Sequence, residues 1–189
     1  GSWGRYIVLL VSGGGRGRMS YWWGWCAARD PGRCVLRMVR VMAAKGAPMP
    51  LALRRMLDLL WMLPSLLHRL SLPSNMKERF RALSIPTPAK SFVRLPGTAS
   101  VWQELQLYQT TALKHLTGLG LLKRDALRDR YASLDTTMVP AEIMKHAIEQ
   151  NIANNALVSF LVNDVGSLPL TGREGIIKRA GLPSRGPIT

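Results

Sequence analysis

Residues 98–120, TASVWQELQLYQTTALKHLTGLG, decide the fold class of this chain. Apolar residues recur there at spacings of one, three or four, which is the spacing of one helix face: Val101, Trp102, Leu105, Tyr108, Ala112 and Leu116. Ser100 and Gln103 form a capping box at the start, and Gly118 or Gly120 can end the segment. The stretch therefore predicts an amphipathic helix of about five turns.

The rest of the second half also has helical patterns. A second helix is predicted from Leu121 to Leu134, and a third, long one from Pro140 to Asn163. The apolar face expected for the third helix consists of Ile143, Ala147, Ile148, Ile152 and Phe160. Thr171 and Glu174 form a second capping box, which predicts a last short helix before Gly181. We therefore predict an all-α fold, with a small domain of three to four helices at 98–189.

Positive charge is concentrated in the first half of the chain. The 189 residues contain 26 Lys and Arg against 11 Asp and Glu, a formal charge of +15. Residues 1–97 hold 16 basic and 3 acidic side chains, whereas residues 98–189 hold 10 and 8. A net charge of +15 favours an anionic partner such as nucleic acid or a membrane surface. Its uneven distribution favours an import or docking feature attached to a nearly neutral helical domain.

The first 97 residues divide into two predicted segments. Residues 1–41 show neither helical nor strand periodicity, so we expect a mostly irregular basic extension without a fold of its own. Residues 42–97 form a basic targeting-like or docking segment that ends in a Pro-rich linker. Within it, Arg54, Arg55 and Asp58 share the polar side of an amphipathic stretch. That pattern is typical of an organellar transit peptide, or of a helix lying on a membrane or a partner protein.

No motif in the sequence indicates catalysis, a cofactor or a metal. The glycine-rich stretch SGGGRGR, residues 12–18, lacks the Lys-Ser/Thr of a phosphate-binding loop. Cys26 and Cys34 have no second cysteine pair, which excludes a four-cysteine zinc site. The two cysteines are either two reduced thiols or one disulfide. We therefore expect a noncatalytic protein with no small-molecule substrate.

Two groups of polar residues are candidates for contacts with another chain. Asn151, Asn154 and Asn155 are unusual within a helix, because Asn competes for backbone hydrogen bonds. Asp125 and Asp129 alternate with basic residues at helical spacings. Each group indicates either an interface with another chain or an exposed polar face.

The segment LLKRDALRDRYASLD, residues 121–135, resembles the centre of subunit 7 of the mitochondrial cytochrome bc complex, the fourteen-kilodalton or ubiquinol-binding-protein family. The matching positions are Leu122, Asp125, Leu127, Asp129, Tyr131 and Asp135, with Leu168-Pro169 downstream. Leu121 stands where that family has a turn glycine, and Ala126 where it has Asp. The resemblance covers residues 100–170. It implies a noncatalytic, matrix-side subunit that packs on cytochrome b and core proteins.

The expected function is that of an accessory subunit in a mitochondrial inner-membrane respiratory complex, with complex III as the first choice. Its partners would be other protein subunits of a large complex, together with the membrane surface or cardiolipin. The predicted interface comprises the six matching positions, the three asparagines and Trp102. The alternative is an organellar ribosomal protein whose basic arm contacts rRNA.

Overall fold

The computed structural model describes residues 30–87 and 97–182, which are mostly helical, so the predicted all-α class is confirmed. The α-helices are α3 (Pro31–Lys45), α4 (Leu51–Met62), α5 (Ser74–Ala82), α6 (Thr98–Gly118), α7 (Arg124–Arg128), α8 (Ala141–Ala153), α9 (Asn155–Ser159) and α10 (Ile176–Arg179). Short helices of other types are η1 (Pro64–Arg69), η2 (Phe160–Asp164) and η3 (Val165–Ser167). Strands β1 (Met49–Pro50) and β2 (Tyr131–Ala132) form a small sheet. None of the described helices is both long and apolar enough to cross a membrane.

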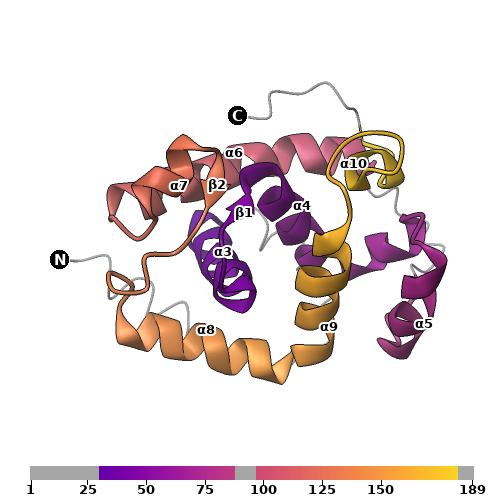
Figure 1. Ribbon diagram of the computed structural model, residues 1–189, viewed down its shortest axis with the longest axis horizontal. Helices are drawn as coiled ribbons and strands as arrows, with labels where there is room; N and C mark the ends of the chain where they lie inside the picture. Colours follow the sequence, from indigo (N-terminus) through magenta and orange to yellow (C-terminus); the bar gives the residue numbers. More distant parts are fainter. Residues whose placement is uncertain (1–29, 88–96, 183–189) are drawn as a thin grey trace.

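Helix α3 lies at the centre of the described fold, between α6 and α8 (Figure 1). Asp30 caps it by accepting a hydrogen bond from the backbone N–H of Gly32 at 2.8 Å, and Gly46 ends it with φ of 62°. Cys34 and Met38 are completely buried. The prediction of an extension without its own fold is therefore wrong for residues 31–41, because their apolar side chains belong to the core. Residues 1–29, with Cys26, lie outside the described residues.

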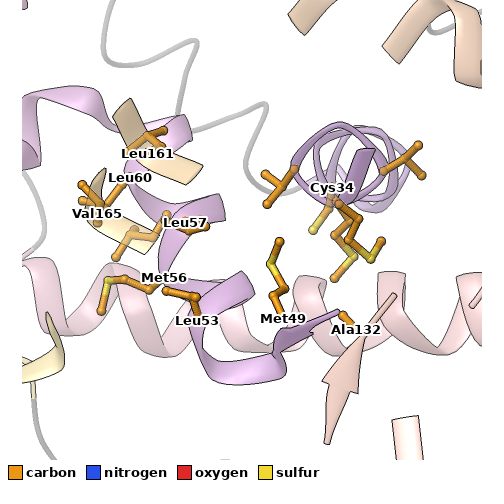
Figure 2. Close-up of a cluster of buried hydrophobic side chains, with 14 of the residues drawn as sticks. Cys34, Met49, Leu53, Met56, Leu57, Leu60, Ala132, Leu161 and Val165 are labelled. Atoms are coloured by element: carbon orange, nitrogen blue, oxygen red, sulfur yellow. The ribbon is translucent and has the colours of Figure 1, made fainter. Parts of the chain in front are cut away.

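Helix α4 is buried over nearly its whole length. All side chains from Ala52 to Leu60 are buried, including those of two arginines and one aspartate. Figure 2 shows Leu57 and Leu60 of α4 close to Leu161 and Val165, while Met49 lies near Cys34 on the other side. The prediction of a helix with a solvated or membrane-facing polar side is wrong here, because its polar residues are covered by α3 and α6.

Helix α6 confirms the helix predicted from the opening stretch. Its buried residues include Val101, Leu105, Ala112 and Leu116, and it ends at Gly118. It begins at Thr98, with Gly97 as a cap that makes no side-chain hydrogen bond. The predicted capping box is therefore not used.

Residues 121–134 fold as a turn and a hairpin rather than as one helix. Only Arg124–Arg128 is helical, and Leu122 bridges to Leu134 in antiparallel fashion. Arg130 adopts φ of 64°, which ends the helical path and turns the chain into β2. Strand β2 pairs with β1, with Met49 opposite Ala132. This pairing joins the hairpin to the start of α4.

The third predicted helix is present but broken. Helix α8 ends at Ala153, and Asn154 adopts φ of −118° before α9 and η2 continue to Asp164. Ile143, Ala147 and Phe160 are buried as expected, but Ile148 and Ile152 are exposed. The core face of α8 is therefore narrower than the apolar pattern predicts. The capping box at residues 171–174 is also not used, because α10 begins after Gly175.

Candidate partner-binding surface

The outer face of α8 carries an exposed apolar stripe. Three of the six large apolar side chains that are exposed in the described part of the chain contribute to it: Ile148 (47%) and Ile152 (69%) on α8, and Met138 (55%) in the turn before the helix. Ala141 is also exposed and Met144 is half-buried. We call these five residues the α8 outer face. In Figure 1, α8 lies along the lower edge of the molecule, with α3 on its inner side.

A shallow groove of about 810 Å³ runs beside this stripe. Its lining includes residues 136–141, Met144 and Ile148. Lys145 and Glu149 also line the groove, so its charges are of both signs. A surface of this composition can bind an apolar partner segment, with polar contacts at the rim.

Arg40 holds α8 against the rest of the fold. Its guanidinium donates to Oδ1 of Asn151 at 3.3 Å and to the backbone carbonyl of Gln150 at 3.1 Å. Nδ2 of Asn151 donates back to the carbonyl of Arg40 at 2.9 Å. The guanidinium also lies 4.5 Å from the ring centroid of Trp61. Burial lowers the pKa of Arg40 to about 10, so it remains charged at neutral pH.

Asp135 forms the turn that presents Met138. Its Oδ1 accepts hydrogen bonds from Oγ1 of Thr137 at 2.6 Å and from the backbone N–H of Thr137 at 3.2 Å. These bonds lower the pKa of Asp135. Side-chain bonds of this kind stabilise a tight turn, so Asp135 helps to hold one end of the α8 outer face.

A buried polar network joins α3, α4 and α6. Asp58 is completely buried and accepts hydrogen bonds from Nε of Arg37 at 2.7 Å and from Nε2 of Gln109 at 2.8 Å. Oε1 of Gln109 in turn accepts from Nε of Arg55 at 2.9 Å. Burial works to lower the pKa of Arg37, but the charge and hydrogen bond of Asp58 outweigh it, and the pKa is raised. Asp58 thus links α4 to both α3 and α6.

Arg54 lies in the same network and is 2% exposed. Its Nε and Nη1 atoms have no hydrogen-bond partner among the described residues. Burial lowers its pKa to about 10, partly offset by the charge of Asp58. The carboxylate of Asp58 therefore offsets the burial of two guanidinium groups, those of Arg37 and Arg54.

Cys34 is a free, buried thiol beside this network. Burial, followed by the charge of Asp58, raises its pKa to about 12. The thiol is therefore protonated at neutral pH and is a poor nucleophile there. Within residues 30–87 and 97–182, no group of three or more His, Cys, Asp and Glu side chains could hold a metal ion.

The interface residues predicted from the sequence do not form one surface. Leu122 is buried, Leu127 is partly buried against the core, and Trp102 lies under the guanidinium of Arg55 at 4.2 Å. These three side chains pack within the chain. Asn151 bonds to Arg40 of the same chain rather than being free for another.

The other predicted residues are more accessible. Asp125, Asp129, Tyr131, Asn154 and Asn155 are exposed, and their contact with a partner stays a prediction. Asp125 pairs with Arg128 at 2.9 Å. Oδ1 of Asn155 accepts from the Ser159 hydroxyl, and Nδ2 of Asn154 donates to the carbonyl of Gln150.

Sequence reasoning missed Met138 and assigned Ile148 and Ile152 to the core. The signal that was available is the asparagine at 151, which lies between them on α8 and faces α3. A polar residue on the inner side at that position implies that its apolar neighbours in sequence point elsewhere.

Residues 24–185 match the model of one protein family, which is described as ABC-three component (ABC-3C) system Middle Component 5. Neither a curated protein nor a solved structure matches the chain. The family match overturns the resemblance to subunit 7 of the cytochrome bc complex, which rested on few positions in a segment that proved to be a hairpin.

The expected function and location are wrong for the same reason. The family belongs to a bacterial system, which contradicts a respiratory-complex subunit, a mitochondrial ribosomal protein and a place at the mitochondrial inner membrane. The transit-peptide interpretation of the first half falls with them. The expectation that the partners are other proteins of a larger assembly is confirmed, because a component of a multi-component system assembles with other protein components. The specific partners that were expected are not supported.

The match covers most of the sequence and includes all the helices described above. On this evidence the chain belongs to the family of ABC-three component system Middle Component 5.

Proposed function

We propose that this chain is a noncatalytic assembly component, which binds another protein component of its ABC-three component system through the α8 outer face. The single observation that carries the proposal is the exposed stripe formed by Ile148 and Ile152 on α8 together with Met138 in the turn before it, since the other side of α8 is anchored to the core. Burying a large aliphatic side chain contributes roughly 1.5–3 kcal/mol, so three such residues can supply much of a binding free energy.

The anchoring of α8 supports a role in binding. Arg40 and Asn151 fix the helix before any partner arrives, so little conformational entropy is lost on association. The turn at Asp135 similarly fixes Met138. A helix that is held in place in this way is suited to a defined protein interface.

The environments of Asp58 and Cys34 support the proposal that the chain is noncatalytic. The buried carboxylate of Asp58 is engaged by Arg37 and Gln109, and the Cys34 thiol is protonated at neutral pH. Both residues are completely buried, and the thiol of Cys34 on α3 donates to Oδ2 of Asp58 on α4 at 4.0 Å.

The test is co-expression of the chain with the other protein components of its system, followed by affinity purification. The double variant Ile148→Asp/Ile152→Asp is expected to lose its partner or bind it at least about tenfold more weakly, since about 1.4 kcal/mol corresponds to tenfold. Leu107→Asp is the matched control, because Leu107 is an equally exposed apolar residue on α6. Both variants should keep the wild-type unfolding midpoint. Undiminished binding by the double variant rules out this face.

A further inference from the structure

A second cavity, of about 740 Å³, lies between η1, α5 and α10. It shares no lining residue with the groove beside α8. Figure 1 shows α5 and α10 on the same side of the molecule, with α5 below α10. Its volume falls within the range of about 300–1,000 Å³ that is usual for small-molecule sites.

The cavity has an apolar wall that includes a pair of rings. Leu67, Leu70 and Leu72 line it and are buried. The rings of His68 and Phe80 meet edge to face, with centroids 5.0 Å apart at an interplanar angle of 72°. His68 is held in place because its Nε2 lies 2.8 Å from the carbonyl of Ile85, to which it can donate. This wall can contact a flat heterocycle.

The charged residues that line the cavity are all basic. Lys77, Arg81 and Arg179 line it, and no Asp or Glu does. Arg179 is partly neutralised by Glu174 and also donates to the backbone carbonyl of Ser71. Lys77 and Arg81 have no ion pair with a described residue, although they lie one turn apart on α5. Like charges at this spacing repel each other, and a bound anion would relieve the repulsion.

Another basic residue of α5, Arg79, differs from Lys77 and Arg81 in having an acidic partner. Arg79, which does not line the cavity, pairs with Asp164 at 2.7 Å. Of these three basic residues of α5, the one outside the cavity lining therefore has an acidic partner, whereas the two that line the cavity have none among the described residues. Lysine and arginine side chains at the mouth of a pocket are the usual partners of phosphate groups.

We propose that this cavity binds a nucleoside phosphate, with the phosphates at Lys77 and Arg81 and the base against the wall formed by His68 and Phe80. An inorganic phosphate would use the cations but leave most of the volume empty. An uncharged nucleoside would use the wall but not the cations. A ligand that contacts both the basic residues and the aromatic wall must carry an anionic group and a flat ring.

The experiment is isothermal titration calorimetry on the full chain, with ADP and UDP as probes because nothing in the lining selects a particular base. We expect inorganic phosphate and adenosine to bind at least about tenfold more weakly than ADP. The double variant Lys77→Ala/Arg81→Ala should weaken ADP binding by at least the same factor, and added salt should weaken it in the wild type. Lys178→Ala is the matched control, since Lys178 is an exposed cation beside Arg179 that does not line the cavity.

Several results would overturn this proposal. They are no binding of either nucleotide, equal affinity for ADP and inorganic phosphate, unchanged affinity in the double variant, or displacement of ADP by an acidic peptide at equal concentration. Because Lys77 and Arg81 are exposed, the double variant should unfold at the wild-type midpoint. The outcome is independent of partner binding at the α8 outer face, so the two proposals can fail separately.

Discussion

Replacement of Asp58 by alanine tests whether the buried polar network holds the fold together. Asp58 is completely buried, and it accepts hydrogen bonds from Arg37 on α3 and from Gln109 on α6. In the Asp58→Ala variant, the guanidinium groups of Arg37 and Arg54 stay in the interior without the carboxylate that they share. The variant therefore loses these two bonds and the longer one from the Cys34 thiol at 4.0 Å, and it removes the negative charge that offsets the burial of Arg54.

The expected decrease in the free energy of unfolding follows from the loss of this carboxylate. Removing one partner of a buried ion pair costs about 3–5 kcal/mol, because the remaining charge is desolvated without compensation. Since small domains are stable by about 5–15 kcal/mol, this is a large fraction of the total. Asp58→Asn keeps the shape and one acceptor oxygen but removes the charge. It should cost about 1.5–3 kcal/mol, the contribution of a hydrogen bond to a charged group.

The assay is urea-induced unfolding followed by far-UV circular dichroism. We expect the order wild type, Asp58→Asn, Asp58→Ala in decreasing stability. Asp125→Ala is the control, because Asp125 forms an exposed ion pair with Arg128 and its loss should leave the midpoint unchanged. If the stability of Asp58→Ala lies within about 1 kcal/mol of wild type, the network does not hold the fold together.

Two further predictions concern Cys34 and Asn151. The folded protein keeps the Cys34 proton up to about pH 12 while the unfolded chain loses it near its usual value of 9.0, so stability should fall as the pH rises between these values. Thermal midpoints measured at about pH 8 and about pH 11 should show a smaller fall in Cys34→Ala than in wild type, and an equal fall would contradict the assignment. Asn151→Ala should remove the bonds to Arg40 and cost about 1–3 kcal/mol. Hydrogen exchange in α8 should then be faster, whereas Asn154→Ala, with its exposed local bond, should change it little.

The sequence was sufficient to predict α6, because its apolar positions repeat at helical spacing along one face. It was insufficient for α4, where Arg54, Arg55 and Asp58 have the pattern of a solvated side. Their burial depends on residues distant in sequence, since Gln109 lies 51 positions after Asp58 and Arg37 lies 21 before it. Local periodicity contains no information about such pairs.

The candidate surface was missed for a related reason. Ile148 and Ile152 extend an apolar pattern that begins with the buried Ile143 and Ala147. Which side of α8 is covered depends on the contact of Asn151 with Arg40, which lies 111 positions away in the sequence. The hairpin was missed because two-residue strands are too short to show an alternating pattern.

The central position of α3 has a consequence for synthesis of the protein on the ribosome. Arg40 emerges 111 residues before Asn151, the partner that completes its contacts. At about 5–20 residues per second, roughly 6–22 seconds pass between the synthesis of Arg40 and that of Asn151. During that time Cys34, Met38 and the other apolar residues of α3 have only part of their final covering. The nascent chain therefore exposes the apolar side of α3 before the helix that covers part of it has been made, and that interval is when a chaperone would be of most use.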